Sequence, residues 1–169
     1  ESCEWALDIC AVLRVVLRHD EGARKEASQW DGEVFTKEDF EGADFRDSVF
    51  EECEFVDCVF TGADLSAAVF DDCSWLRCEL SNCKVSDTRF RRASFTECRA
   101  RGVTFSNCHR FALEFEFVDC NLSYSSFFGL HIRGTSFKNC KLDETDFGEA
   151  QLVDSNFEGS DLHRTVFHH

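Results

Sequence analysis

The sequence predicts a solenoid, a rod built from short stacked repeats, and two observations support this prediction. The first is that a large apolar residue recurs at every fifth position over most of the chain. The second is that the position two residues before each of these is restricted to small residues. A period of five fits neither the 3.6-residue period of a helix nor the two-residue alternation of a strand. A fixed internal period is instead the signature of a repeat protein.

The large apolar positions form two series with a break in register between them. The first series begins at Phe35 and ends at Phe105, and the second begins at Phe117 and ends at Phe167. Twelve residues separate Phe105 from Phe117, which is two more than two repeats require. We therefore predict an irregular segment at residues 106–116 that bulges or loops out of the repeat.

The small positions contain nine of the eleven cysteines, and only Cys3 and Cys10 lie outside them. Cys packs as a small apolar side chain when it is buried. Metal or redox chemistry is the alternative interpretation, but the predicted interior has no His ligands to complete a metal site. We expect core thiols with no metal and no cofactor. Reduced thiols are typical of a cytoplasmic protein, which is the location we expect.

The chain divides into two predicted segments. Residues 1–30 form an N-terminal amphipathic helix and a polar connector, and residues 31–167 form the solenoid. Trp5 and Val16 share the apolar face of the predicted helix. Because the ends of a solenoid expose strand edges and core, one role of this helix is a cap. A homodimer contact through the same face is the other role.

The net charge of −15 narrows the classes of partner. Nucleic-acid binding requires a surplus of Lys and Arg, and so does binding to an anionic membrane surface. No apolar run is long enough to span a bilayer. We therefore expect no direct nucleic-acid or membrane contact, and a protein partner that is basic or that normally grips DNA.

The charge is distributed unevenly along the solenoid. Residues 31–75 contain 14 acidic and 2 basic residues, whereas residues 76–110 contain 3 acidic and 8 basic residues. Residues 111–169 are acidic again, with 10 acidic and 4 basic residues. The rod is thus predicted to have an acidic end, a basic central belt and a second acidic part.

The repeat unit resembles that of the pentapeptide-repeat family, which reads roughly Ala-(Asp/Asn)-Leu-X-X. Clear examples are Ala43-Asp44-Phe45, Ala63-Asp64-Leu65 and Ser160-Asp161-Leu162. The resemblance implies an all-β fold, a right-handed quadrilateral parallel β-helix with one repeat on each side and about twenty residues per coil. On such a fold, residues twenty positions apart become neighbours in adjacent coils, about 4.8 Å apart.

Twenty-residue spacing gathers three pairs of charged residues into one column, namely Glu51–Glu52, Asp71–Asp72 and Arg91–Arg92. The Asp and Arg pairs can form exposed ion pairs, which contribute little stability individually. Glu opposite Asp at strand spacing is repulsive, and stability alone does not call for it. The column is either a solvated charged face or a surface that presents spaced negative charge. On the second interpretation, the four acidic residues are predicted to bind a partner.

The register break supplies a second candidate contact. It contains His109, Arg110 and Phe111, which we predict as partner-binding residues because a loop on a rigid scaffold is a frequent place for function. A bulge without function is the alternative. No arrangement of Ser, Cys, Asp and His typical of nucleophilic catalysis is present, and there is no Gly-rich phosphate loop. We predict a protein that is not an enzyme and has no catalytic residues.

Within the family, two short stretches resemble proteins that act on topoisomerases. Residues 117–127 resemble the quinolone-resistance (Qnr) proteins, and residues 128–134 resemble the albicidin-resistance protein. These resemblances imply a DNA mimic that binds DNA gyrase or topoisomerase IV and either inhibits it or protects it from quinolone-type poisons. The relatives typically dimerise through a C-terminal helix, whereas the helix predicted here is N-terminal. The alternative is a structural or protein-interaction module with no topoisomerase partner.

Overall fold

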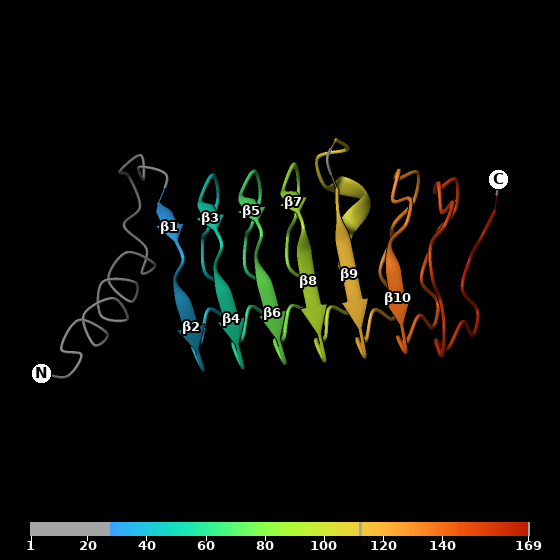
Figure 1. Cartoon of the computed structure of the whole chain (residues 1–169), viewed down its shortest axis with the longest axis horizontal. Helices are drawn as coiled ribbons and strands as arrows, with labels where there is room; N and C mark the ends of the chain where they lie inside the picture. The colour runs from blue at the N-terminus through green and yellow to red at the C-terminus, as the bar shows by residue number, and fades with distance from the viewer. Residues whose placement is uncertain (1–27, 112, 169) are drawn as a thin grey trace, which may run out of the picture.

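The computed structural model describes residues 28–111 and 113–168, which form a rod of stacked coils with short parallel strands (Figure 1). The described residues contain no α-helix. The predicted N-terminal helix falls on residues 1–27, outside the described part of the chain. The elements are β1 (Gln29–Asp31), β2 (Val34–Thr36), β3 (Val49–Glu51), β4 (Glu54–Val56), β5 (Val69–Asp71), β6 (Ser74–Leu76), β7 (Arg89–Arg91), β8 (Ala93–Thr96), the 3-10 helix η1 (Phe105–Asn107), β9 (Phe115–Val118) and β10 (Ser136–Lys138).

Strand pairing follows four parallel ladders, which we call the four faces of the rod. The first face is the sheet β1-β3-β5-β7, and the second is the sheet β2-β4-β6-β8-β9-β10. The third and fourth faces are columns of isolated parallel bridges. The third contains Asp39, Val59, Glu79, Arg99, Asn121, Lys141 and Asp161, and the fourth contains Asp44, Asp64, Lys84, Thr104, Ser126, Asp146 and Val166. The predicted all-β parallel solenoid is confirmed.

The register of the ladders is twenty residues, with one exception. Ser74 of β6 pairs with Ser94 of β8, but Ser94 pairs with Glu116 of β9, twenty-two residues later. The following pair, Glu116 with Ser136, returns to twenty. The predicted two-residue break is therefore confirmed, and it is absorbed within one coil.

Stacked aromatic rings fill the interior. The ring of Phe50 lies 4.8 Å from that of Phe70 at an angle of 5°, and Trp75 lies 4.4 Å from Phe95 at 9°. Rings from neighbouring faces meet edge to face, as Phe50 and Phe55 do. Such aromatic pairs contribute about 0.5–1.5 kcal/mol each beyond the burial of their area. The period of five thus places one inward apolar side chain on each face of every coil, and most of those on the first two faces are aromatic.

The small inward positions have a second role that their size does not reveal. The Oγ of Thr88 donates a hydrogen bond to the carbonyl of Leu65 at 2.7 Å, and the Sγ of Cys83 donates to the carbonyl of Phe60 at 2.9 Å. Cys58, Cys73, Cys78, Cys98, Cys120 and Cys140 make equivalent contacts. Cys, Ser and Thr therefore link one coil to the one before it, whereas Ala only fills space.

The corners of the rod require residues with positive φ. Gly42 and Gly62 have φ of 62° and 66° in turns closed by Ala43 N–H to the carbonyl of Phe40 and by Ala63 N–H to that of Phe60. A type II turn needs positive φ at its third residue, which Gly adopts without strain. Eighteen non-Gly residues also have positive φ, and most of them are polar residues whose side chains are exposed. The corners therefore display charged side chains without disturbing the core.

The stack includes residues that lie before the predicted boundary at residue 31. Trp30 belongs to β1, and its ring stacks on Phe50 at a centroid distance of 4.5 Å and an angle of 9°. Trp30 is half-buried and covers the aromatic column at this end of the described rod.

Candidate partner-binding surface

The first face brings the predicted charge column together as expected. Glu51 of β3 pairs in register with Asp71 of β5, and Asp71 pairs with Arg91 of β7. The neighbouring residues Glu52, Asp72 and Arg92 all have positive φ, between 48° and 53°, and they stand at the corner where the first face ends. The column thus continues across three coils.

The two arginines neutralise one half of the predicted acidic surface. Arg92 contacts both Asp71, at 2.7 Å, and Asp72, at 2.6 Å, and Arg91 contacts Asp71 at 3.1 Å. The hydrogen bond from the Arg92 guanidinium is the main reason that the pKa of Asp72 lies below its usual range. Asp71 and Asp72 are therefore engaged within the protein, so that a partner has to compete with Arg91 and Arg92 for them.

The other half of the predicted surface remains free. Glu51 and Glu52 are exposed and have no ion pair among the described residues. Asp31 of β1 lies in register beside Glu51 and is also exposed without an ion pair. Three carboxylates thus gather beside β3 with no cation between them. Sequence reasoning missed Asp31 because the predicted column began at Glu51.

A count of charged residues in each coil would have shown that the acidic surface extends to the coil before Glu51. The first coil (residues 31–50) contains seven acidic and two basic residues, and the second coil (residues 51–70) contains five acidic and none basic. The third coil (residues 71–90) has four acidic and three basic residues, and the fourth coil (residues 91–112) has one acidic and five basic. The negative potential is therefore concentrated in the first two coils.

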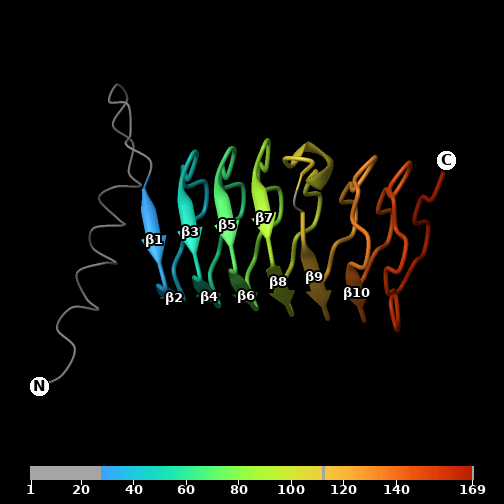
Figure 2. The ribbon, with the colours of Figure 1, turned by 45° about the horizontal axis from the view of Figure 1, so that its top comes forward.

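The predicted loop residues lie on the same face, beyond β7. The N–H of His109 binds the carbonyl of Thr88, and the N–H of Glu114 binds the carbonyl of Phe90. Residues 109–111 leave the ladder and project from the rod beside η1 (Figures 1 and 2). The side chain of Phe111 is 79% exposed, and Arg110 is exposed next to it. A large apolar side chain so exposed is available to a protein partner.

The two predicted sets share one face but do not form one continuous site. Arg91 and Arg92 lie between Glu52 and the loop that contains Phe111. The face therefore has an acidic part, an ion-paired part and a loop with an exposed aromatic ring. Binding of a partner to each of these residues remains a prediction.

The thiols lie in the core as expected, and burial makes two of them unreactive. All nine cysteines among the described residues are free and buried. Burial raises the pKa of Cys83 to about 12, and it also raises that of Cys108. A thiol with a raised pKa is a poor nucleophile and a poor metal ligand at neutral pH. Within the described ranges, no group of three or more His, Cys, Asp or Glu side chains is placed to hold a metal ion.

The described chain also lacks a membrane-crossing helix. Residues 28–111 and 113–168 contain no helix of the length and apolarity that crossing requires.

The four ladders, the five-residue period and the inward small residues define a class of protein, the pentapeptide-repeat solenoids. Two family models match the sequence. The model described as "Pentapeptide repeat region" matches residues 68–147, and the one described as "Pentapeptide repeats (8 copies)" matches residues 39–74 and 131–168. This chain belongs to the pentapeptide-repeat family. No curated protein sequence matches it.

Several solved structures are similar to this chain. A trypsin-treated variant of QnrB1, a plasmid-mediated fluoroquinolone resistance protein, is 21% identical, with a TM-score of 0.41, over 88% of this chain and 76% of QnrB1. A pentapeptide-repeat protein from the Arabidopsis thaliana thylakoid lumen is 20% identical, with a TM-score of 0.37, over 78% and 66%. HetL, a regulator of heterocyst differentiation from the cyanobacterium Nostoc, is 12% identical, with a TM-score of 0.34, over 99% and 97%.

Proposed function

We propose that this protein is a non-catalytic DNA mimic that binds DNA gyrase or topoisomerase IV through its first two coils. The observation that carries the proposal is the group formed by Asp31, Glu51 and Glu52, which has no basic partner in the described part of the chain. The outcome for the topoisomerase is either inhibition or protection from a quinolone-type poison. The short sequence resemblance to the Qnr proteins supports this choice of partner.

The charge density of the first two coils supports mimicry of DNA. B-DNA carries about one negative charge per 1.7 Å of its axis, and successive coils are spaced by about 4.8 Å, so about three net charges per coil are needed to match it. The first and second coils each have a net charge of −5. The fourth coil has a net charge of +4 and does not match DNA. A basic DNA-binding groove is therefore expected to prefer the first two coils.

A supercoiling assay with DNA gyrase, in the presence and absence of ciprofloxacin, tests the proposal. We expect the parent protein to change supercoiling or drug sensitivity at micromolar concentration. The double variant E51K/E52K is expected to lose at least about tenfold in potency, because it places cations inside the acidic group. Its stability should be unchanged, since both side chains are exposed and unpaired.

A matched control separates position from total charge. Glu149 and Asp154 are exposed, have positive φ like Glu52, and have no ion pair among the described residues. The variant E149K/D154K therefore makes the same change in net charge at the other end of the rod. We expect it to keep the potency of the parent. Equal loss in both variants would show that only net charge matters, and no effect of the parent would refute topoisomerase binding.

A second candidate function is a protein-interaction module without a topoisomerase partner. It is favoured by the exposed aromatic side chains of Phe111, Tyr124 and Phe128, which are 79%, 51% and 45% exposed. Phe111 lies in the fourth coil, whose net charge of +4 does not resemble DNA. Activity in the supercoiling assay that is lost in E51K/E52K but kept in Phe111→Ala would argue against this second candidate.

A further inference from the structure

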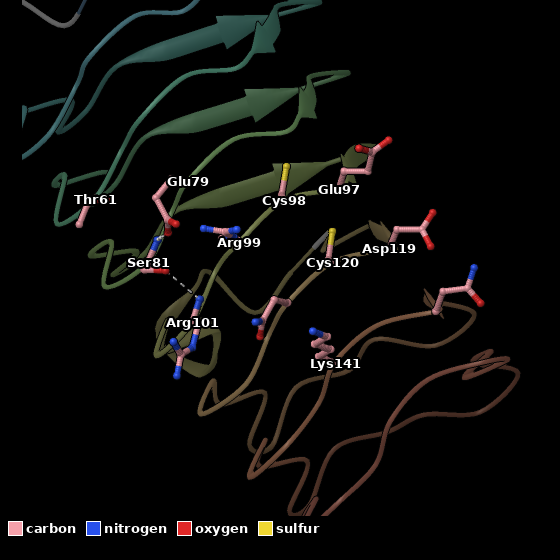
Figure 3. Close-up of a pocket in the computed structure, with 12 residues that line it drawn as sticks. Thr61, Glu79, Ser81, Glu97, Cys98, Arg99, Arg101, Asp119, Cys120 and Lys141 are labelled. Carbon is pink, nitrogen blue, oxygen red and sulfur yellow. Dashed lines mark hydrogen bonds between the residues drawn. The ribbon is translucent and has the colours of Figure 1, made fainter.

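A hollow of about 570 Å³ lies on the third face, away from the acidic column (Figure 3). Three cationic side chains line it: Arg99, Arg101 and Lys141. Arg99 and Lys141 both pair with Asn121 in the bridge column, so they stand one coil on either side of it. Arg101 follows at the adjacent corner. The hollow therefore gathers three cations on a protein whose net charge is −15.

None of these three cations has an ion pair among the residues that the structure describes, although all three are exposed. Elsewhere on the rod, several basic residues pair with a carboxylate one coil earlier. Arg77 contacts Asp57 at 2.7 Å, and Lys84 approaches Asp64 to 3.7 Å. Seven of the fourteen Lys and Arg residues in the described chain have no ion pair, and three of these seven meet at the hollow.

The carboxylate beside Arg99 makes a contact within its own coil. The carboxylate one coil before Arg99 belongs to Glu79, and its Oε1 accepts a hydrogen bond from the backbone N–H of Ser81 at 2.9 Å. Glu79 forms no ion pair with Arg99. The guanidinium of Arg99 is left with its donors free, and an unpaired guanidinium is a strong binder of oxyanions.

Two further contacts orient donors at the hollow. The Oδ1 of Asn121 accepts hydrogen bonds from the N–H of Ser123, at 3.2 Å, and from its Oγ, at 2.8 Å. With Oδ1 occupied, the side-chain NH₂ of Asn121 remains to donate. The guanidinium carbon of Arg101 lies 5.4 Å above the ring of Tyr124, and this cation–π contact restrains the side chain.

Three carboxylates also line the hollow, those of Glu79, Glu97 and Asp119. Glu97 and Asp119 stand at the corner opposite Arg101, as Figure 3 shows. An anion is therefore expected on the side of Arg101 and Lys141, where it avoids the carboxylates of Glu97 and Asp119. The space is open enough for one small anionic group.

We propose that this hollow binds a phosphate group, held by Arg99, Arg101, Lys141 and the side-chain NH₂ of Asn121. A tetrahedral phosphate carries close to two charges and accepts hydrogen bonds from several directions, which matches three cations and an amide around one space. A carboxylate has one charge and a planar set of acceptors, and it satisfies fewer of these donors. The site is independent of topoisomerase binding, because it lies on a different face.

The test is an NMR titration of the full ¹⁵N-labelled chain with inorganic phosphate, at constant ionic strength. We expect saturable shifts of the amide signals of Arg99, Arg101 and Asn121. The variants Arg99→Gln and Lys141→Gln should each weaken binding by about tenfold. The rest of the spectrum reports in the same experiment that each variant is folded.

Arg89→Gln is the matched control, since Arg89 is exposed on β7 of the first face and has no ion pair among the described residues. It should bind phosphate as the parent does. Phosphoserine that binds more tightly than inorganic phosphate identifies a phosphate ester as the ligand, and equal affinity identifies free phosphate. Shifts that do not saturate, equal loss in Arg89→Gln, or acetate that binds as tightly as phosphate would overturn the proposal.

Discussion

The first two coils and the two that follow have similar interiors and different surfaces. Phe50 in the one region and Phe90 in the other are both 1% exposed, and both stack on Phe70 from opposite sides. Outside, the first two coils each have a net charge of −5, whereas the third has −1 and the fourth has +4. The comparison teaches that the inward positions determine the fold, while the outward positions are free to vary. Function is therefore to be sought in the outward positions.

The largest effect is expected from removal of a core ring in either region. Phe50→Ala and Phe90→Ala each remove a fully buried ring from an aromatic column, which costs about 3–5 kcal/mol of unfolding free energy. Urea denaturation measures both, and Glu51→Gln serves as the surface control. The interiors would not be equivalent if Phe90→Ala cost less than about 1 kcal/mol.

A smaller loss of stability is expected when a side-chain hydrogen-bond donor that links two coils is removed. Thr88→Val keeps the shape of the side chain but removes its hydrogen bond to the carbonyl of Leu65. That carbonyl retains the N–H of Ala68 as a partner, so we expect a loss of about 1 kcal/mol rather than the full cost of an unsatisfied group. Thr88→Ser, which keeps the donor, is the control in the same denaturation experiment. If Thr88→Val and Thr88→Ser were equally stable, the donor would contribute nothing.

The stability that the ion-paired part of the first face contributes should depend on pH. Because Arg92 lowers the pKa of Asp72 in the folded protein, the contribution of this pair is present at neutral pH and is lost as the pH falls through that lowered pKa. Arg92→Gln should therefore cost about 0.2–1 kcal/mol at pH 7 and nothing below about pH 2. Unfolding followed as a function of pH measures this. A pH-independent cost would exclude the pair as its origin.

The smallest effect on stability is expected from substitution of Glu51, and it is a gain where the other substitutions cause a loss. Glu51 lies in register between the carboxylates Asp31 and Asp71, so Glu51→Gln removes repulsion and should stabilise the fold by a few tenths of a kcal/mol. The gain should vanish in 1 M salt, where the Debye length is about 3 Å and the repulsion between exposed charges farther apart than this is largely screened. Denaturation at low and high salt measures the difference. A destabilised variant would mean that Glu51 has a stabilising contact after all.

The sequence predicted the parts of the molecule that follow from the period alone. The ladders of twenty residues, the break before Phe117 and the Asp71–Arg91 pairing each depend only on which residue stacks on which. The sequence predicted the charge column less completely. That Arg92 reaches both Asp71 and Asp72 depends on a long side chain at a corner with positive φ. The spacing of residues in the sequence does not predict that one arginine contacts both carboxylates.

The hollow on the third face was also beyond sequence reasoning. The basic belt predicted that Arg99 and Arg101 lie near each other, but it did not distinguish free cations from paired ones. Spacing places Glu79 beside Arg99, yet Glu79 accepts a hydrogen bond from the N–H of Ser81 and forms no ion pair with Arg99. Only the side-chain geometry shows whether an ion pair is formed.

The coil of twenty-two residues shows how this architecture accommodates change in length. Residues 109–111 leave the ladder, which resumes at Glu114, and the next pair, Glu116 with Ser136, is again twenty residues apart. Because each coil contacts only its neighbours, an added segment alters the outline of one layer and leaves the remaining layers in phase. The same corner is therefore a natural insertion point for a longer peptide, such as an epitope or a fluorescent tag, in a rod whose other layers stay in place.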